Sequence, residues 1–106
     1  MPVFPKSARI TKSREFDFLL KEGKRRHGRH LGLCWQKAPE RRLGVVISRK
    51  IRGAAKKNRI KRVVREFFRL QRELFPQGEV IVIAKMGTDA LTNSQLRGAL
   101  YDLLAD

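Results

Sequence analysis

The stretch from Ala54 to Phe75 has two faces that require opposite surroundings, and it constrains the fold more than any other part of the chain. Its apolar side chains recur at the i, i+3, i+4, i+7 spacing of an amphipathic helix. They are Ile60, Val63, Val64, Phe67, Leu70 and Leu74. The opposite face carries Asn58, Lys61, Arg62, Arg65, Arg69 and Arg72. The pattern predicts one long helix that packs against a protein core and turns a cationic face outward.

The whole chain shares this excess of positive charge. Its 106 residues include 25 Lys and Arg against 10 Asp and Glu, which gives a formal net charge of +15. Charge of one sign at this density disfavours compactness, so we expect a polyanionic partner, with nucleic acid as the first candidate and an anionic membrane as the second. Between Lys56 and Arg72 there is a single acid, Glu66, so pairing within the helix cannot neutralise its cations. Nucleic acid is favoured because the core needs the apolar side of the helix.

Composition bounds the class of protein. The length fits one domain spanning residues 1–106. The only cysteine, Cys34, excludes an internal disulfide and a cysteine-based zinc site, and it suits a reducing compartment. No run approaches the roughly 18 apolar residues of a membrane span, and the first residues have no hydrophobic signal core. We therefore expect a soluble cytoplasmic protein that has no contact with a membrane.

Two further helices are predicted, one near each end of the chain. Residues 1–9 contain two prolines and no periodicity, which indicates an extended arm. Residues 11–23 and 92–106 have apolar side chains at helical spacing behind short polar residues that can serve as N-caps. The candidate caps are Thr11 or Ser13 for the first helix and Asn93 or Ser94 for the last.

Strands are predicted between these helices. Residues 24–30 are a loop or a short edge strand, and residues 31–37 and 43–48 form an antiparallel hairpin. Residues 79–84, EVIVIA, form a strand buried on both faces. The result is an α+β domain with a small sheet covered by helices. If the last strand lies parallel to 45–47, the long helix is their crossover, and general statistics favour a right-handed one.

No set of side chains in the sequence predicts a protein-borne active site. His27 and His30 have no carboxylate or cysteine set around them, so we expect no metal site. Cys34 lacks a nucleophile partner and is best explained as a half-buried strand thiol. No phosphate-loop motif occurs. Phe16 and Trp35 lie among lysines and arginines, which suits stacking of unpaired bases, although each alone is more often a core residue.

The stretch from Leu43 to Phe68 resembles the protein subunit of bacterial ribonuclease P. The basic helix motif of that family, Arg-Asn-Arg followed by Ile-Lys-Arg and further arginines, corresponds here to Lys57-Asn58-Arg59-Ile60-Lys61-Arg62 and Arg65. The run from Ile10 to Phe16 and the segments GVVISRKI and VIVIAK resemble family segments as well. The resemblance covers roughly residues 9–105.

This resemblance implies a fold and a function. The fold is a two-layer α/β sandwich with a small mixed sheet, of the class of the second domain of a small-subunit ribosomal protein, in which the long helix makes a left-handed crossover. The function is to assist a catalytic RNA that removes the 5′ leader of precursor tRNA. Catalysis and Mg²⁺ would belong to the RNA, with no organic cofactor, no catalytic protein residue and no required protein oligomer.

The resemblance also implies two RNA-binding surfaces. The residues expected to face the catalytic RNA are Lys57, Asn58, Arg59, Lys61, Arg62, Arg65 and Arg69. Those expected to line a cleft for the leader of precursor tRNA are Lys12, Phe16, Cys34 or Trp35, Ser48 and Lys50. Lys57 departs from the usual arginine of the family, and Leu20 stands where a second cleft phenylalanine is common. Strand alternation leaves open whether Cys34 or Trp35 faces the cleft.

Overall fold

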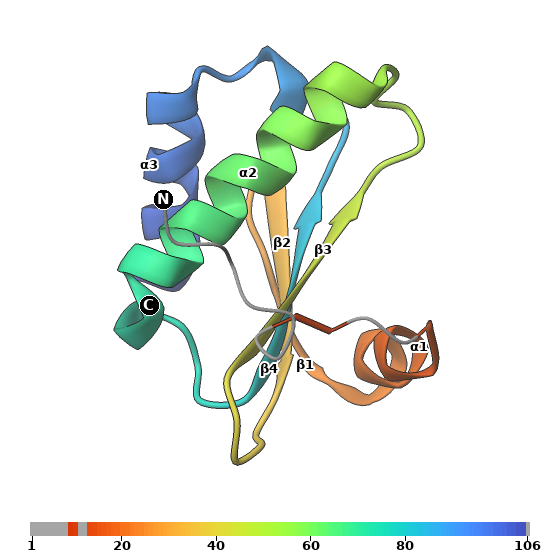
Figure 1. Ribbon diagram of the computed structural model, residues 1–106, viewed down its shortest axis with the longest axis vertical. Coiled ribbons are helices and arrows are strands. Elements are labelled where there is room, and N and C mark those ends of the chain that lie inside the picture. Colours follow the sequence, from red (N-terminus) through yellow and green to blue (C-terminus); the bar gives the residue numbers. More distant parts are fainter. Residues whose placement is uncertain (1–8, 11–12, 106) are drawn as a thin grey trace.

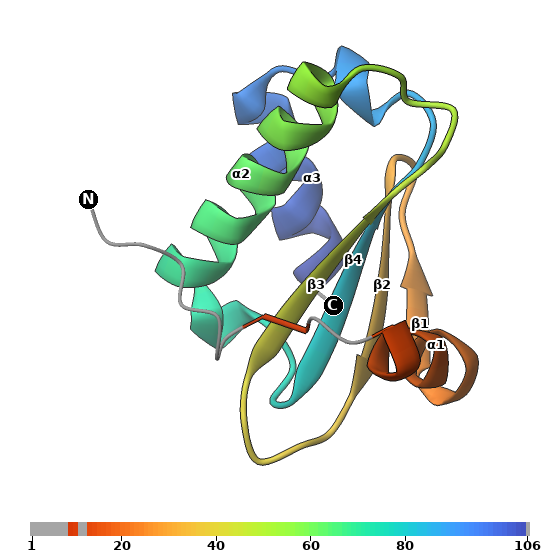
Figure 2. The ribbon, with the colours of Figure 1, turned by 45° about the vertical axis from the view of Figure 1, so that its right-hand side comes forward.

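A four-stranded sheet separates the helices into two layers (Figures 1 and 2). The computed structural model describes residues 9–10 and 13–105. In chain order the elements are α1 (Ser13–Glu22), β1 (Lys24–His27), β2 (Leu31–Gln36), β3 (Arg42–Ile47), α2 (Ala54–Leu70), the 3-10 turn η2 (Arg72–Leu74), β4 (Glu79–Ala84), the 3-10 turn η3 (Thr88–Ala90) and α3 (Asn93–Leu104).

The sheet order is β1-β2-β4-β3, so the predicted hairpin between 31–37 and 43–48 is wrong. β4 lies between β2 and β3, antiparallel to the first and parallel to the second. The most apolar strand takes this central place because only there are both of its faces covered. The observed hairpin joins β1 to β2. Of the two structures predicted for residues 24–30, a loop or a short edge strand, the edge strand is observed over residues 24–27.

Helix α2 is the crossover between the parallel strands β3 and β4, as expected if those strands ran parallel. With α2 in front and both strands pointing up, the C-terminal end of β4 lies to the left of that of β3 (Figure 1). The crossover is therefore left-handed, as the family resemblance implied and contrary to the general statistical rule.

Alternate residues of the strands feed two separate cores. Helices α2 and α3 cover one face of the sheet, where the core includes Leu33, Val80 and Val82. Helix α1 covers part of the other face, over Cys34 and Ile81 (Figure 2). This alternation places neighbouring residues of one strand on opposite sides of the protein.

Helix α2 is shorter than predicted. It ends at Leu70, and the Leu70 and Leu74 side chains are 62% and 42% exposed, so their expected place in the buried stripe is wrong. Phe68 and Phe75 are buried instead. After the short turn η2, Phe75 folds back until its ring centroid lies 4.9 Å from that of Phe68 and 6.0 Å from that of Phe67. The two aromatic side chains fill the space that the leucines leave.

The N-caps of the first and last helices were also predicted. The N-cap of α3 is Thr92, not Asn93 or Ser94. The Thr92 hydroxyl accepts a hydrogen bond from the Gln95 backbone N–H at 3.1 Å, and the Gln95 side chain accepts one from the Thr92 N–H at 2.9 Å, which completes a capping box. Of the two candidate caps of α1, Ser13 is already the first helical residue and Thr11 lies outside the described residues. Among the described helices, none is both long and apolar enough to cross a membrane.

Candidate nucleic-acid interface

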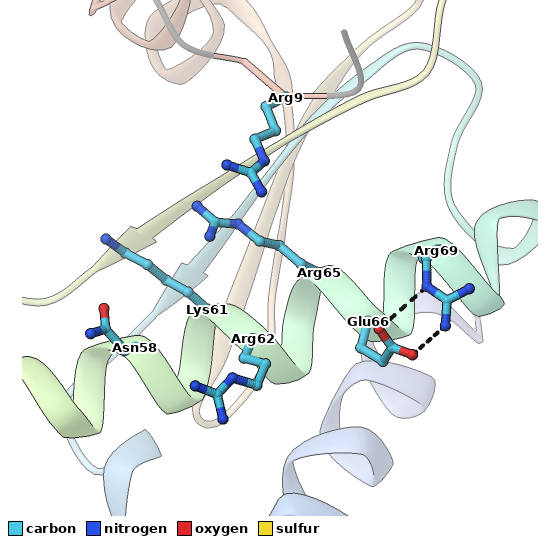
Figure 3. A pocket seen from close by; sticks show the side chains of 7 residues that line it. All are labelled: Arg9, Asn58, Lys61, Arg62, Arg65, Glu66 and Arg69. Atoms are coloured by element: carbon cyan, nitrogen blue, oxygen red, sulfur yellow. Dashed lines mark hydrogen bonds and ion pairs between the residues drawn. The ribbon is translucent and has the colours of Figure 1, made fainter. Parts of the chain in front are cut away.

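The outward face of α2 forms one wall of a groove of about 340 Å³, and Arg9 approaches from the other side (Figure 3). We call it the cationic groove. Its lining residues are Arg9, Asn58, Lys61, Arg62, Arg65, Glu66 and Arg69. All except Arg9 and Glu66 were predicted to bind RNA.

Arg9 reaches the groove because its backbone is held beside β3. Arg9 bridges Leu43 in parallel register, and the next N–H, of Ile10, donates to the Leu43 carbonyl at 3.0 Å. The Arg42 guanidinium donates to the Arg9 carbonyl at 3.0 and 3.3 Å. With its main chain fixed, Arg9 extends its side chain toward Arg65 (Figure 3). No sequence pattern predicts this position for Arg9, because the pairing joins residues far apart in the chain.

The groove concentrates positive charge. Desolvation lowers the pKa of the Arg65 guanidinium, and the charge of Arg9 lowers it further, yet an arginine stays charged at any physiological pH. The one acid in the lining, Glu66, accepts hydrogen bonds from Arg69, one of them at 3.3 Å, and this contact lowers the pKa of Glu66. Glu66 is thus paired with Arg69, and the Arg9 and Arg65 side chains point toward each other across the groove (Figure 3). A bound anion would relieve their repulsion.

Two predicted RNA-binding cations lie outside the groove lining. Arg59 donates to the Asn93 side-chain oxygen at 2.8 Å and to the Asp89 carbonyl at 3.0 Å, so it ties α2 to η3 and the start of α3. Lys57 is half-buried. Beyond the end of α2, the Arg72 guanidinium lies 6.0 Å from the centre of the Phe68 ring. The helical repeat therefore provides fewer groove residues than the motif suggested.

The opposite face of the sheet is covered in part by α1, and Phe16 is the aromatic residue that this helix turns toward β3. The Phe16 ring lies directly against Gly44, where an added Cβ would approach its Cε1 atom to 2.6 Å. Arg42 fixes α1 over the sheet by donating to both Glu15 carboxylate oxygens at 2.7 and 3.1 Å and to Glu79 at 2.9 Å. The absence of a side chain at Gly44 thus leaves room for the Phe16 ring against β3.

Cys34 and Trp35 lie on opposite faces of β2. Cys34 faces α1, where its thiol is 1% exposed and donates to the Leu19 carbonyl at 2.9 Å. Burial raises the pKa of this thiol, and the nearby charge of Arg25 only partly opposes the shift. Trp35 packs on the other face, against the α2 and α3 core. Phe16 and Trp35 therefore cannot line the same cleft.

The other predicted leader-binding residues lie at the end of β3. By alternation from Val46, which packs with the α1 core, Ser48 continues on the α1 face. The Ser48 hydroxyl accepts a hydrogen bond from the backbone N–H of the exposed Lys50 at 3.2 Å. Lys12 lies outside the described residues. Phe16 and Ser48 thus share a face of the sheet, and Lys50 follows at its edge.

The described residues include no group of three or more His, Cys, Asp or Glu side chains placed to hold a metal ion. His27 and His30 lie near the β1–β2 turn, beside Asp102 of α3. The charged and aromatic surfaces described above are therefore the strongest candidates for a functional site.

Comparison with known proteins points to one family. The model of the Ribonuclease P family matches residues 4–106. The ribonuclease P protein component of Desulfotalea psychrophila is 41% identical over 102 residues, covering 93% of this chain and 85% of the relative. That of Geotalea uraniireducens is 34% identical over 103 residues, covering 95% and 91%.

Solved structures agree with the sequence comparisons. The RNase P protein of Staphylococcus aureus superposes with a TM-score of 0.87 at 28% identity, covering 94% of each chain. The RNase P protein of Thermotoga maritima gives a TM-score of 0.80 at 30% identity, covering 91% of this chain and 94% of that one.

Proposed function

The chain belongs to the ribonuclease P protein family, and we propose that it binds the catalytic RNA of that enzyme through the cationic groove and the 5′ leader of precursor tRNA on the α1 face. Family membership makes it the protein component of the bacterial ribonucleoprotein that matures tRNA 5′ ends, and it implies an RNA partner. The observation that carries the proposed division of labour is the separation of the two surfaces by the sheet.

The cationic groove suits the RNA backbone. Lys61 and Arg65 project from α2 toward Arg9, and Arg62 leaves the helix on its other side (Figure 3). Each phosphate that meets one of these cations releases a condensed counterion, so affinity falls as salt rises. Arginine adds a planar fork of donors that matches phosphate oxygens. Asn58 at the end of the groove can donate to or accept from a sugar or base.

The α1 face suits a single strand. Phe16 offers an aromatic edge beside the sheet, and Ser48 and Lys50 offer a hydroxyl and an ammonium group at the end of β3. Stacking with phosphate attraction is how proteins hold unpaired nucleotides. Cys34, buried and bonded to Leu19, contributes to the floor of this surface and has no chemical role in binding.

The chemistry of leader removal lies with the RNA. Mg²⁺ in this account is held mainly by RNA phosphates, and the protein supplies positive charge and position, with no organic cofactor. The proposed substrate of the assembled ribonucleoprotein is precursor tRNA, and the location that agrees with this role is the cytoplasm.

The salt dependence of RNA binding tests the groove. Arg62→Ala and Arg65→Ala should each weaken binding to the catalytic RNA and reduce the slope of log K against log salt by about 0.7–0.9, the loss of one phosphate contact. Arg97→Ala is the matched control, because Arg97 is an exposed arginine on α3 outside the groove lining. If all three variants keep the wild-type slope, the groove is not the RNA interface.

A further inference from the structure

A pocket of about 390 Å³ at the end of β2 belongs to neither proposed RNA surface. We call it the Trp35 pocket. It is lined by Glu22, Gly23, Lys24, Trp35, Gln36, Lys37, Pro76 and Gln77. It lies on the β1–β2 side of the sheet, whereas the cationic groove lies beside β3, and the Trp35 side chain points away from the α1 core.

Close backbone packing fixes both walls of the pocket. A Cβ on Gly23 would approach the Leu19 carbonyl oxygen to 2.6 Å and the Trp35 carbonyl oxygen to 2.9 Å. On the other side, Gly78 has φ 129° and lies so close to the Gln36 carbonyl oxygen that any side chain there would collide with it. Glycine at both positions lets the two flanking segments rest directly on the backbone of β2.

The rim is held in the same way. Gln77 accepts a hydrogen bond from the Arg41 guanidinium at 2.9 Å and donates one to the Pro39 carbonyl at 3.1 Å. Arg41 also donates to the Arg72 carbonyl at 3.2 Å. These contacts keep the turn before β4 beside the pocket and not inside it. The cavity is therefore already formed in the free protein.

One side of the indole is occupied by a fixed cation. The Arg26 guanidinium lies 5.5 Å from the centre of the Trp35 ring, and it donates to the Leu103 carbonyl at the end of α3 at 2.8 Å. Trp35 is half-buried and lines the pocket with the remainder of its surface. An aromatic ring backed by a held arginine is well placed to stack against a second flat group.

The charges around the opening favour an anion. Lys24 pairs directly with Trp35 across the β1–β2 ladder, and Lys37 follows at the end of β2; both are exposed. The single acid of the lining is Glu22. The volume lies near the lower end of the range of about 300–1,000 Å³ for ligand pockets, which suits one nucleotide and not a folded partner.

We infer that the Trp35 pocket holds one unpaired nucleotide of an RNA strand, with its base against the indole and its phosphates at Lys24 and Lys37. This inference rests on the proposed function only in taking RNA as the partner. It adds a third contact, on a side of the protein that neither the cationic groove nor the α1 face covers. An RNA strand that leaves the cationic groove or the α1 face can thus be held at a third point, away from both surfaces.

Trp35 is the only tryptophan of the chain, so its fluorescence reports the pocket directly. The full-length protein is titrated with a single-stranded hexamer of adenylate, and the anisotropy of a labelled hexamer measures total binding in parallel. Stacking on the indole should quench the fluorescence as the hexamer binds. An abasic oligonucleotide with the same number of phosphates should bind without quenching. Binding of the hexamer without quenching, or equal quenching by the abasic strand, would overturn the inference.

Variants separate this pocket from the cationic groove. Lys24→Ala with Lys37→Ala should weaken the quenching transition and lower its salt slope by about 1.4, which is about 0.7 for each single-strand phosphate contact. Arg97→Ala, which removes an exposed arginine outside both linings, should leave the quenching transition at its wild-type position. Arg62→Ala with Arg65→Ala should lower the total binding measured by anisotropy more than it shifts the quenching transition. Loss of quenching in this groove variant, with no change in the lysine variant, would place the bound strand in the groove and refute the pocket. The same protein variants are also tested for stimulation of precursor-tRNA cleavage by the catalytic RNA. This second assay tests the proposed function separately from the fluorescence quenching.

Discussion

Replacing Arg42 by alanine tests how the two proposed RNA surfaces are held in place. Its guanidinium donates to Glu15 of α1 at 2.7 and 3.1 Å, to Glu79 of β4 at 2.9 Å and to the Arg9 carbonyl at 3.0 Å. Contacts with Glu15 and Glu79 raise the pKa of Arg42, so the cation persists over the whole stability range of the protein. One side chain thus joins α1, the sheet and the segment that carries Arg9 into the groove.

The size of the loss follows from the burial of the three partners. A hydrogen bond to a charged group contributes about 1.5–3 kcal/mol, and loss of one member of a buried ion pair costs about 3–5 kcal/mol. The side chains of Arg42, Glu15 and Glu79 are 21%, 30% and 20% exposed. Water can therefore solvate the two carboxylates in the variant, which offsets part of the free energy lost. We expect Arg42→Ala to lower the free energy of unfolding by about 2–4 kcal/mol, and at about 4 °C per kcal/mol the midpoint of thermal unfolding by about 8–16 °C.

Thermal unfolding followed by circular dichroism measures this loss. Arg97→Ala removes the same charge from an exposed site on α3 and should change the free energy of unfolding by no more than about 0.5 kcal/mol. Both variants remove one positive charge from a chain of net charge +15, so any gain in stability from reduced charge repulsion is common to both and cancels in the comparison. If the two variants have the same midpoint, the Arg42 contacts do not hold α1 and Arg9 in place.

Three other predictions concern single side chains. Alkylation of Cys34 should be far slower in the folded protein than in denaturant, because the thiol is buried and burial raises its pKa; equal rates would contradict the buried position. Because the pKa is raised in the folded state, the contribution of the Cys34 thiol to stability is complete below the ordinary thiol pKa of about 8.5 and is lost as the pH rises further. Phe16→Leu should reduce the preference of the reconstituted enzyme for precursor over mature tRNA, whereas an equal loss for both would leave Phe16 a core residue only. Arg59→Ala should lower the midpoint of thermal unfolding, because it loses hydrogen bonds of 2.8 Å to Asn93 and 3.0 Å to Asp89. It should keep the wild-type salt dependence of RNA binding, and a slope reduced as much as in Arg62→Ala would put Arg59 in the interface.

Local periodicity was enough to predict most helices and strands, including the two faces of α2. The buried Ile60, Val63 and Val64 follow the expected stripe because helix spacing alone sets which side chains share a face. The error came where the helix ended. Whether Leu70 or Phe75 is buried depends on how the chain turns before β4, which periodicity does not determine.

Long-range pairing accounts for the rest of the differences. The sequence alone did not predict that β4 would separate β2 from β3, because the partner of a strand is chosen by the whole sheet. The same holds for Arg9, whose place in the groove follows from its bridge to Leu43. Trp35 and Cys34 show the sensitivity of a strand to register, since a shift of one residue exchanges its two faces.

Reconstitution at low Mg²⁺ measures whether the chain acts by bringing catalytic RNA and precursor tRNA together. Precursor-tRNA cleavage is measured with the catalytic RNA alone, with the wild-type protein, and with Arg62→Ala together with Arg65→Ala. Cationic protein side chains can replace part of the Mg²⁺ that screens RNA phosphates, so the wild-type protein should raise kcat/KM strongly at low Mg²⁺ and less at high Mg²⁺. The double variant should lose most of this stimulation. Cleavage at the same rate with and without the wild-type protein, at every Mg²⁺ concentration, would show that the protein does not assist the catalytic RNA.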